Sequence, residues 1–150
     1  MDKSDLKLLA LLQDNARTTV QAMADRIGAS TASVQRRLRM LREGGVIKKE
    51  VAVLDAQKMG FDVTAIVSVE LERDRLDQID AFKRKARLDA QVLNFYCIAG
   101  DADFVMVVVA KDMRDYEAFT HRFFFSDKNV RKFRTSIVVS TEKATLALPI

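Results

Sequence analysis

The sequence predicts an α+β protein in which a helix-turn-helix is followed by a ferredoxin-like β-α-β-β-α-β unit. Apolar residues recur at helical spacing over the first 43 residues, and the spacing becomes strand-like and alternating near residue 62. Residues 1–50 contain ten basic and six acidic side chains, whereas residues 51–150 contain fifteen of each. The formal net charge of +4 therefore belongs to the helical segment. Such an asymmetry indicates a nucleic-acid or membrane contact at that end of the chain.

The composition argues against an enzyme or a metalloprotein. Cys97 and His121 are the only cysteine and histidine, which excludes a disulfide framework and a multi-cysteine metal site. The sequence has no Gly-rich phosphate loop and no HExxH or GxSxG motif. We expect Cys97 to pack within a strand, His121 to lie on the surface, and Asp101 and Asp103 to shape a turn. No catalytic residue, metal or cofactor is predicted.

The hydropathy pattern argues against a membrane protein. No apolar run approaches the roughly 20 residues that a membrane helix needs. Asp2, Lys3 and Asp5 at the start of the chain are unlike a secretory signal. We therefore expect a soluble, cytoplasmic protein with no membrane partner.

Three helices are expected in the first fifty residues. The apolar spacing predicts helices over Asp2–Asp14 and Val20–Ile27, and Gly28 is suited to end the second. Ser30 is expected to cap a third helix that runs to about Glu43. Two short helices joined by a glycine-containing turn after a longer first helix are typical of a helix-turn-helix.

The third helix has the pattern of a DNA-recognition helix. Val34, Leu38 and Leu41 form a buried stripe, and a basic, hydrogen-bonding surface lies opposite. Glutamine and arginine can read adenine and guanine edges in the major groove, and lysine and arginine can neutralise phosphates. The predicted DNA-binding residues are Ser30, Thr31, Ser33, Gln35, Arg36, Arg39 and Lys48.

Two alternatives remain open for the basic side chains of this helix. They can form an ordinary solvated helix face that contacts nothing. Arg37 lies at the edge of the buried stripe, so it can be a structural ion-pair partner instead of a DNA ligand.

The sequence divides into a DNA-binding domain over residues 1–48, a linker strand over 49–61 and an α/β effector-binding and oligomerisation domain over 62–150. Val51 and Val53 alternate with Ala52 and Leu54 in the linker, which is typical of a strand. We expect this strand to leave the DNA-binding domain, either alone or paired with a short wing.

The α/β domain is expected to contain four strands and two helices. The strands are predicted over Thr64–Glu72, Val92–Ala99, Phe104–Ala110 and Val130–Thr141. One helix is predicted over Arg73–Leu88, with Leu76, Ile79, Phe82 and Ala86 inward. The other follows a cap at Asp112, with Met113, Tyr116, Phe119 and Phe123 inward.

One face of the predicted sheet lacks a cover, because both helices lie on the other. Ile66 and Ser68 on one strand, with Ser136, Val138 and Ser140 on another, give this face a partly apolar character. Such a face is better buried against a second copy than left in solvent.

The order and spacing of many short matches resemble the Lrp/AsnC family of prokaryotic transcription regulators. In the first half the matching residues are Asp2, Asp5, Leu8, Leu9, Leu12, Gln13, Arg17, Ala24, Gly28, Ser30, Val34, Arg37, Leu38, Leu41, Gly45, Val46, Ile47, Leu54, Asp55 and Gly60. In the second half they are Gly100, Asp103, Tyr116, Phe119, Thr135, Ser136, Lys143 and Pro149.

The resemblance implies an N-terminal winged helix-turn-helix and a C-terminal domain that binds a small effector, usually an amino acid. It implies homodimers, paired through the C-terminal sheets, that assemble into tetramers, octamers or larger particles. It also implies a prokaryotic, nucleoid-associated protein. By position, the effector-binding residues would be Gly100, Asp101, Ala102 and Asp103, with Thr135 and Ser136 nearby.

Together these features predict a sequence-specific DNA-binding regulator of amino-acid-related metabolism whose partners are double-stranded DNA and an amino-acid effector. The alternative is a metabolite-sensing oligomerisation module whose DNA binding is architectural or independent of the effector.

Overall fold

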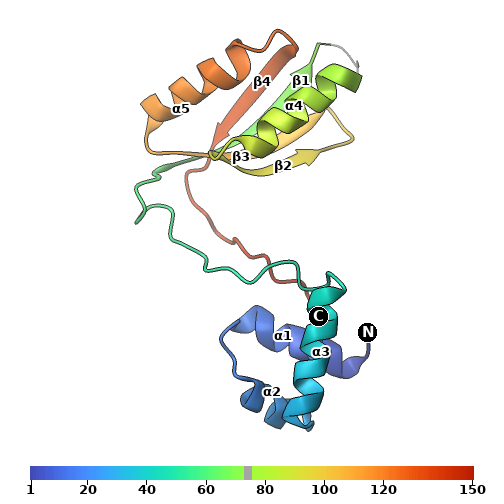
Figure 1. Ribbon diagram of the computed structural model, residues 1–150. Helices are drawn as coiled ribbons and strands as arrows, with labels where there is room; N and C mark the ends of the chain where they lie inside the picture. The colour runs from blue at the N-terminus through green and yellow to red at the C-terminus, as the bar shows by residue number, and fades with distance from the viewer. Residues whose placement is uncertain (73–75) are drawn as a thin grey trace. The chain divides into compact units, whose positions relative to one another are not determined.

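The computed structural model describes residues 1–72 and 76–150. Three helices come first: α1 (Lys3–Asp14), α2 (Val20–Ile27) and α3 (Thr31–Glu43). They belong to one compact unit, formed by Met1–Val53 and Lys143–Ile150, while Leu54–Glu142 forms a second unit (Figure 1). The sequence assigned the last eight residues to the α/β domain, but here they group with the helices.

Each of the three helices begins at a side-chain cap. Asp2 accepts hydrogen bonds from the amides of Ser4 and Asp5, at 2.8 and 2.9 Å, and Asp5 accepts one from the Asp2 amide at 2.8 Å. This reciprocal capping box satisfies amides that have no partner within the helix. Thr19 caps α2, and Ser30 caps α3 as predicted.

The helical unit has a small apolar core at the crossing of its three helices. Leu8 and Val34 are fully buried, and Met23, Ala24 and Leu38 complete the cluster. Gly28 adopts a left-handed conformation (φ +69°) at the end of α2, which a side chain would strain. The chain can therefore turn sharply into α3, as the sequence predicted.

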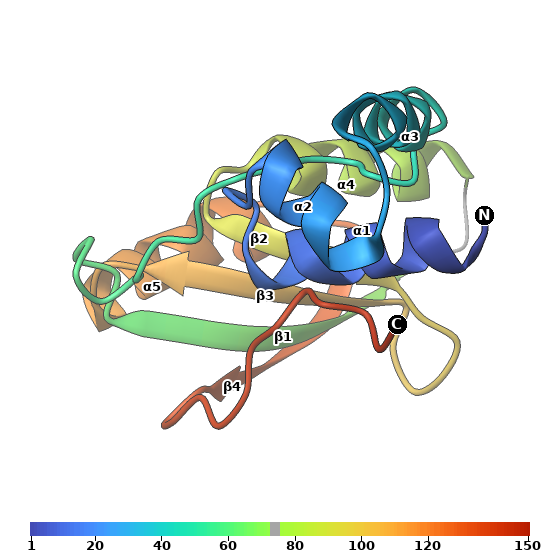
Figure 2. The same cartoon turned by 90° about the horizontal axis from the view of Figure 1, so that it is seen from below.

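The second unit has the predicted order of elements. They are β1 (Val63–Leu71), α4 (Leu76–Leu88), β2 (Val92–Cys97), β3 (Phe104–Ala110), α5 (Met113–Thr120), η1, a π-helical turn (His121–Phe125), and β4 (Val130–Ile137). The strands lie in the order β2-β3-β1-β4, and all neighbours are antiparallel. Figure 2 shows the strands side by side with α4 and α5 on the far side of the sheet. The ferredoxin-like prediction is confirmed.

The central strand β1 organises the core of this unit. Its alternate residues Ala65, Val67 and Val69 have no exposed surface, because they face the two helices. Aromatic rings fill the space between them and the helices, with the Phe82 and Phe123 centroids 5.7 Å apart. The Phe119 and Phe123 rings stack at 4.9 Å.

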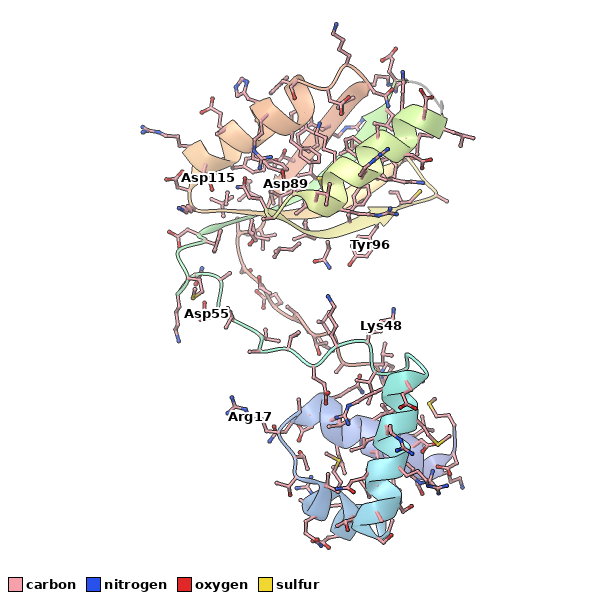
Figure 3. All side chains as sticks on the ribbon, in the orientation of Figure 1. Arg17, Lys48, Asp55, Asp89, Tyr96 and Asp115 are labelled. Carbon is pink, nitrogen blue, oxygen red and sulfur yellow. The ribbon has the colours of Figure 1, made fainter. Side chains whose placement is uncertain are left out.

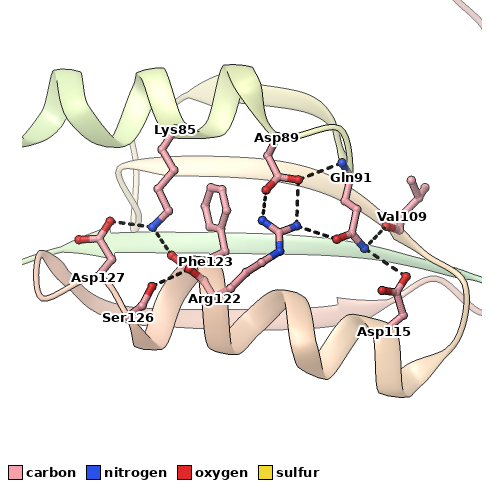
Figure 4. Close-up of polar contacts among 9 residues, drawn as sticks. All are labelled: Lys85, Asp89, Gln91, Val109, Asp115, Arg122, Phe123, Ser126 and Asp127. Atoms are coloured by element: carbon pink, nitrogen blue, oxygen red, sulfur yellow. Dashed lines mark hydrogen bonds and ion pairs between the residues drawn. The ribbon is translucent and has the colours of Figure 1, made fainter.

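A polar network joins the end of α4 to α5 and η1 (Figure 4). Arg122 donates to both carboxylate oxygens of Asp89 and, at 2.7 Å, to the side-chain oxygen of Gln91. Gln91 in turn donates to Asp115 at 3.3 Å. Burial raises the pKa of Asp89, but the hydrogen bonds from Arg122 and from the Gln91 amide together lower it by more, so the pKa lies below its ordinary value. The network thus links the C-terminal end of α4 to residues of α5 and η1 that are distant from it in sequence.

The structure corrects the ends of several predicted elements. Residues 73–75, at the start of the helix predicted over Arg73–Leu88, lie outside the described residues. Leu76 and Met113 were expected to point inward but are exposed. Each is the first residue of its helix, and the apolar stripe begins one turn later, at Ile79 and Tyr116.

Strand lengths also differ from the prediction. The last strand ends at Ile137 instead of Thr141, although the Val138 amide still donates to the Thr64 carbonyl at 2.9 Å. Since β1 begins at Val63, residues 140 and 141 have no neighbour in it. Similarly, residues 49–61 contain no strand, and their backbone hydrogen bonds are local turns such as Phe61 to Ala56. Cys97 is exposed instead of packed, because it ends the edge strand β2.

Candidate DNA-binding and effector sites

The predicted DNA-binding side chains lie along α3 and the segment that follows it. Gln35, Arg36 and Arg39 are exposed, whereas Thr31 and Ser33 are partly buried near the start of the helix. Ser30 accepts a hydrogen bond from the Ser33 amide at 3.2 Å, so its own hydroxyl hydrogen remains available to donate. Lys48 is exposed in a segment without secondary structure (Figure 3).

Arg37 is a structural residue, which answers the question that the sequence left open. Its Nη1 atom donates to Asp2 at 2.7 Å and to Asp5 at 2.8 Å, so it links α3 to the capping box of α1. The pKa values of Asp2 and Asp5 lie below the ordinary value of 3.8. The main cause is the hydrogen bond that each carboxylate accepts from the backbone amide of the other aspartate, and the second is the hydrogen bond from Arg37. The guanidinium is therefore occupied within the helical unit.

The other three arginines of α3 differ in whether they form an ion pair. Arg42 forms a two-point ion pair with Glu50, with N–O distances of 3.0 and 3.2 Å. Within residues 1–72 and 76–150, neither Arg36 nor Arg39 forms an ion pair. These two exposed guanidiniums are thus the part of the helix that can bind an outside anion.

The predicted effector loop connects β2 to β3 at the C-terminal end of β1. The Asp103 amide donates to the Val69 carbonyl at 3.0 Å, and the Ile98 amide donates to the Asp103 carbonyl at 3.0 Å. In the described part of the chain, the amides of Gly100, Asp101 and Ala102 donate no hydrogen bond. These three successive donors are suited to an anion such as a carboxylate.

Asp103 has a structural role that the sequence did not predict. Its Oδ2 atom accepts a hydrogen bond from the Leu71 amide at 2.7 Å. The pairing of β1 with β4 shifts register at this point, between Glu70 and Leu71, so the Leu71 amide needs a partner. The second oxygen, Oδ1, has no partner within the described residues and can still accept from a cation.

Thr135 and Ser136 are not brought to this loop within one chain. Thr135 lies opposite Val67 in the neighbouring strand, and its hydroxyl is 2.6 Å from that of Tyr116. Ser136 follows it along the strand and points to the other face of the sheet. Burial raises the pKa of Tyr116, which keeps its phenol protonated as a partner for Thr135.

The outward face of the sheet is more apolar than the sequence analysis recognised. Tyr96 and Val105 are paired across β2 and β3, next to Val107 and Ile66. Tyr96 is 52% exposed and projects away from the helices (Figure 3). The alternation within Phe104–Ala110 could have revealed the two valines, because inward and outward positions alternate along it.

Across the described residues, no three potential metal-ligating side chains lie together. His121 and Asp101 are exposed, as is Cys97. None of the described helices combines the length and apolar character required to cross a membrane.

The two units define a class of protein: a two-domain regulator with a DNA-binding helix-turn-helix and a ligand-sensing α/β domain. The sequence matches the family model of the Lrp/AsnC ligand binding domain over residues 64–148. It matches that of a winged helix-turn-helix DNA-binding domain over residues 1–48. The chain belongs to the Lrp/AsnC family of transcriptional regulators.

Similar proteins cover the full length of the chain. It is 43% identical, over its entire length and 89% of the relative, to an HTH-type transcriptional regulator of Sinorhizobium fredii. It is 32% identical to the DNA-binding transcriptional activator DecR of Escherichia coli strain K12, over 100% of this chain and 99% of DecR. A regulator from Neisseria meningitidis, solved as a complex with L-Met, has a TM-score of 0.94 and 27% identity and covers 99% of this chain and 96% of its own.

Replacing Arg37 by Met should raise the pKa of Asp2 and Asp5 toward 3.8, because each carboxylate loses a charged hydrogen-bond donor. Their pKa values are lower in the folded state than in the unfolded state. The ion pairs therefore stabilise the fold above about pH 3.8 and lose this effect as the pH falls through the folded-state values.

Carboxyl NMR titration and acid unfolding followed by circular dichroism measure both effects. Arg37→Met should unfold at a higher pH than the wild type, whereas Arg42→Met should leave the titration of Asp2 and Asp5 unchanged. Identical titration of the two aspartates in wild type and Arg37→Met would contradict the assignment of Arg37 to structure.

Proposed function

We propose that the chain is a sequence-specific DNA-binding regulator of amino-acid-related metabolism and that an amino acid modulates its binding. The observation that supports DNA recognition most directly is that, among the described residues, only two of the four arginines on α3 form ion pairs. Arg37 and Arg42 are engaged in ion pairs, whereas Arg36 and Arg39 are exposed beside Gln35. An apolar back that seats the helix and a cationic, hydrogen-bonding front suit the major groove.

Regulators of this kind bind through two separable contributions. Contacts to phosphates supply affinity that falls as salt rises, because counterions are released from DNA. Contacts to base edges supply sequence preference. We assign Arg36, Arg39 and Gln35 to base or adjacent phosphate contacts, and Ser30, Thr31, Ser33 and Lys48 to phosphates. As a DNA-binding regulator, the protein would act at the nucleoid in the cytoplasm.

The β2–β3 loop supports an amino-acid effector. The unbonded amides of Gly100, Asp101 and Ala102 offer donors to a carboxylate, and Oδ1 of Asp103 offers an acceptor to an ammonium group. The L-Met complex of the Neisseria meningitidis regulator is a precedent for such a ligand on this fold. Since Thr135 and Ser136 lie on another strand, we propose that a second copy completes the site.

The uncovered sheet face supports a homodimer. Ile66 on the inner strand β1 is 45% exposed and Tyr96 on the edge strand β2 is 52% exposed, and both belong to the apolar outward surface. Burial of this face against a second copy removes that surface from water. We propose that such dimers assemble further into tetramers, octamers or larger particles. Sedimentation of the wild type as a monomer at micromolar concentration would contradict this assembly.

Replacing Arg36 or Arg39 by Ala should weaken binding to the protein's own upstream DNA. A lost base contact reduces affinity by about 5- to 150-fold (about 1–3 kcal/mol), and a lost phosphate contact lowers the salt dependence by about one charge. Mobility-shift titrations across a salt series measure both quantities. Arg114→Ala removes the same charge from an exposed position on α5 and is the matched control.

Unchanged affinity of both Arg36→Ala and Arg39→Ala would exclude these side chains as DNA contacts. Equal affinity of the wild type for its upstream DNA and for random DNA would contradict sequence-specific regulation. Binding that does not respond to salt would exclude a phosphate contribution.

Two variants of Asp103 separate its structural and effector roles. Asp103→Ala should lower the free energy of unfolding by about 1 kcal/mol, because the Leu71 amide loses its acceptor. Asp103→Asn keeps an oxygen for that amide but loses the negative charge. Thermal-shift measurements with amino acids should therefore show an Asn variant of nearly native stability that no longer responds to the effector. Full stabilisation of Asp103→Asn by the effector would exclude Asp103 as the ammonium partner.

A further inference from the structure

The C-terminal segment is attached to α1 by a pair of hydrogen bonds that play no part in the proposed function described above. Gln13, near the end of α1, accepts a hydrogen bond from the Leu148 amide through Oε1 at 2.6 Å. It donates from Nε2 to the Leu148 carbonyl at 3.1 Å. The two residues are 135 positions apart in the chain.

The geometry of this pair is that of a peptide-binding contact. The carboxamide of Gln13 offers a donor and an acceptor, and it engages both backbone groups of a single residue, as the opposite residue does in a hydrogen-bonded pair of an antiparallel sheet. The side chain of Leu148 is 68% exposed, so the contact depends on the backbone and not on burial of the leucine. Residues Lys143–Ile150 accordingly group with the helical unit.

Resting on the proposed function, we propose that Lys143–Ile150 is a strap that docks on α1 and restrains the DNA-binding unit, with Gln13 as its latch. The strap follows directly after the α/β unit, which ends at Glu142. The helical unit is thus tied to that unit twice, covalently through the segment after α3 and non-covalently through the strap.

The second attachment matters because the first is loosely held. Residues 51–60 are all exposed and contain no helix or strand. A single linker of this kind allows the DNA-binding unit to adopt many orientations. A strap limits those orientations, and in a dimer this raises the effective concentration of the second helix-turn-helix at the second half-site. The strap should therefore affect DNA with two half-sites more than DNA with one.

Two substitutions release the latch without disturbing the helix. Gln13→Ala removes both hydrogen bonds at an exposed position where alanine is a better helix former. Gln13→Glu keeps an acceptor for the Leu148 amide but places a carboxylate oxygen against the Leu148 carbonyl. Gln57→Ala is the matched control, because Gln57 is exposed and its side chain has no hydrogen bond within the described residues.

The docking is tested on the full chain by a spin label at residue 146. Leu146 is 86% exposed, so Leu146→Cys provides a labelling site, and Cys97→Ser removes the exposed native thiol. Electron paramagnetic resonance should show restricted motion of the label in this background and with Gln57→Ala. It should show fast motion with Gln13→Ala and with Gln13→Glu. Equal motion in all four proteins would overturn the docking.

The restraint is tested with DNA that the wild type selects from a random pool, prepared with one or with two half-sites. Both Gln13 variants should lose about 2- to 10-fold in affinity for the two-site duplex, the range expected when a weak hydrogen-bonded contact is lost. Their affinity for the one-site duplex should remain native. A released label with unchanged two-site affinity would overturn the restraint.

The failure of this proposal is distinguishable from that of the proposed function. If the wild type selects no DNA sequence, the proposed regulator function is wrong. The proposed effect of the strap on binding to two half-sites is then wrong as well. The mobility of the label decides independently whether Gln13 holds the C-terminal segment.

Discussion

The α/β unit depends on one constraint, the strict alternation of side chains along the central strand β1. Ala65, Val67 and Val69 face the helices with no exposed surface, and they fix the positions of both helices. The intervening residues, Ile66 among them, face outward and give the sheet its uncovered apolar surface. At the end of the same strand, the register shift leaves an amide that donates its hydrogen bond to Asp103, and this bond anchors the β2–β3 loop proposed to bind the effector. One strand thus relates the core, the proposed dimer face and the proposed ligand site.

In the helical unit, some basic side chains form internal ion pairs and others stay exposed to solvent. The excess of basic residues in the first third of the chain suggests a broadly cationic surface, yet Arg37 and Arg42 are neutralised by nearby carboxylates. The cationic surface that we propose for DNA binding is therefore smaller and consists chiefly of Arg36 and Arg39 on the exposed side of α3. Each subunit of an oligomer would add another such surface. A modest charge per chain could therefore give strong collective attraction for DNA.

The features that could be predicted from the sequence are those that depend on residue spacing and helix caps along a short stretch of chain. The strand-like alternation that includes Val67, and the position of Gly28 at the end of α2, follow from short-range rules, and the structure confirms both. Features that depend on a distant partner could not be predicted in the same way. Cys97 is exposed because its strand lies at the sheet edge. The occupied hydroxyl of Thr135 and the contact of Gln13 with the C-terminal segment depend on residues that only the folded chain brings together.

We propose that an amino acid bound to the α/β unit changes the affinity of the helical unit for DNA. A decisive experiment measures the DNA affinity and the melting temperature of the full chain with each of the twenty amino acids. At least one amino acid should raise the melting temperature and change the DNA affinity by about 5- to 150-fold, the usual range of allosteric coupling. An amino acid that raises the melting temperature without changing the DNA affinity would disprove this coupling, as would DNA binding that no amino acid alters.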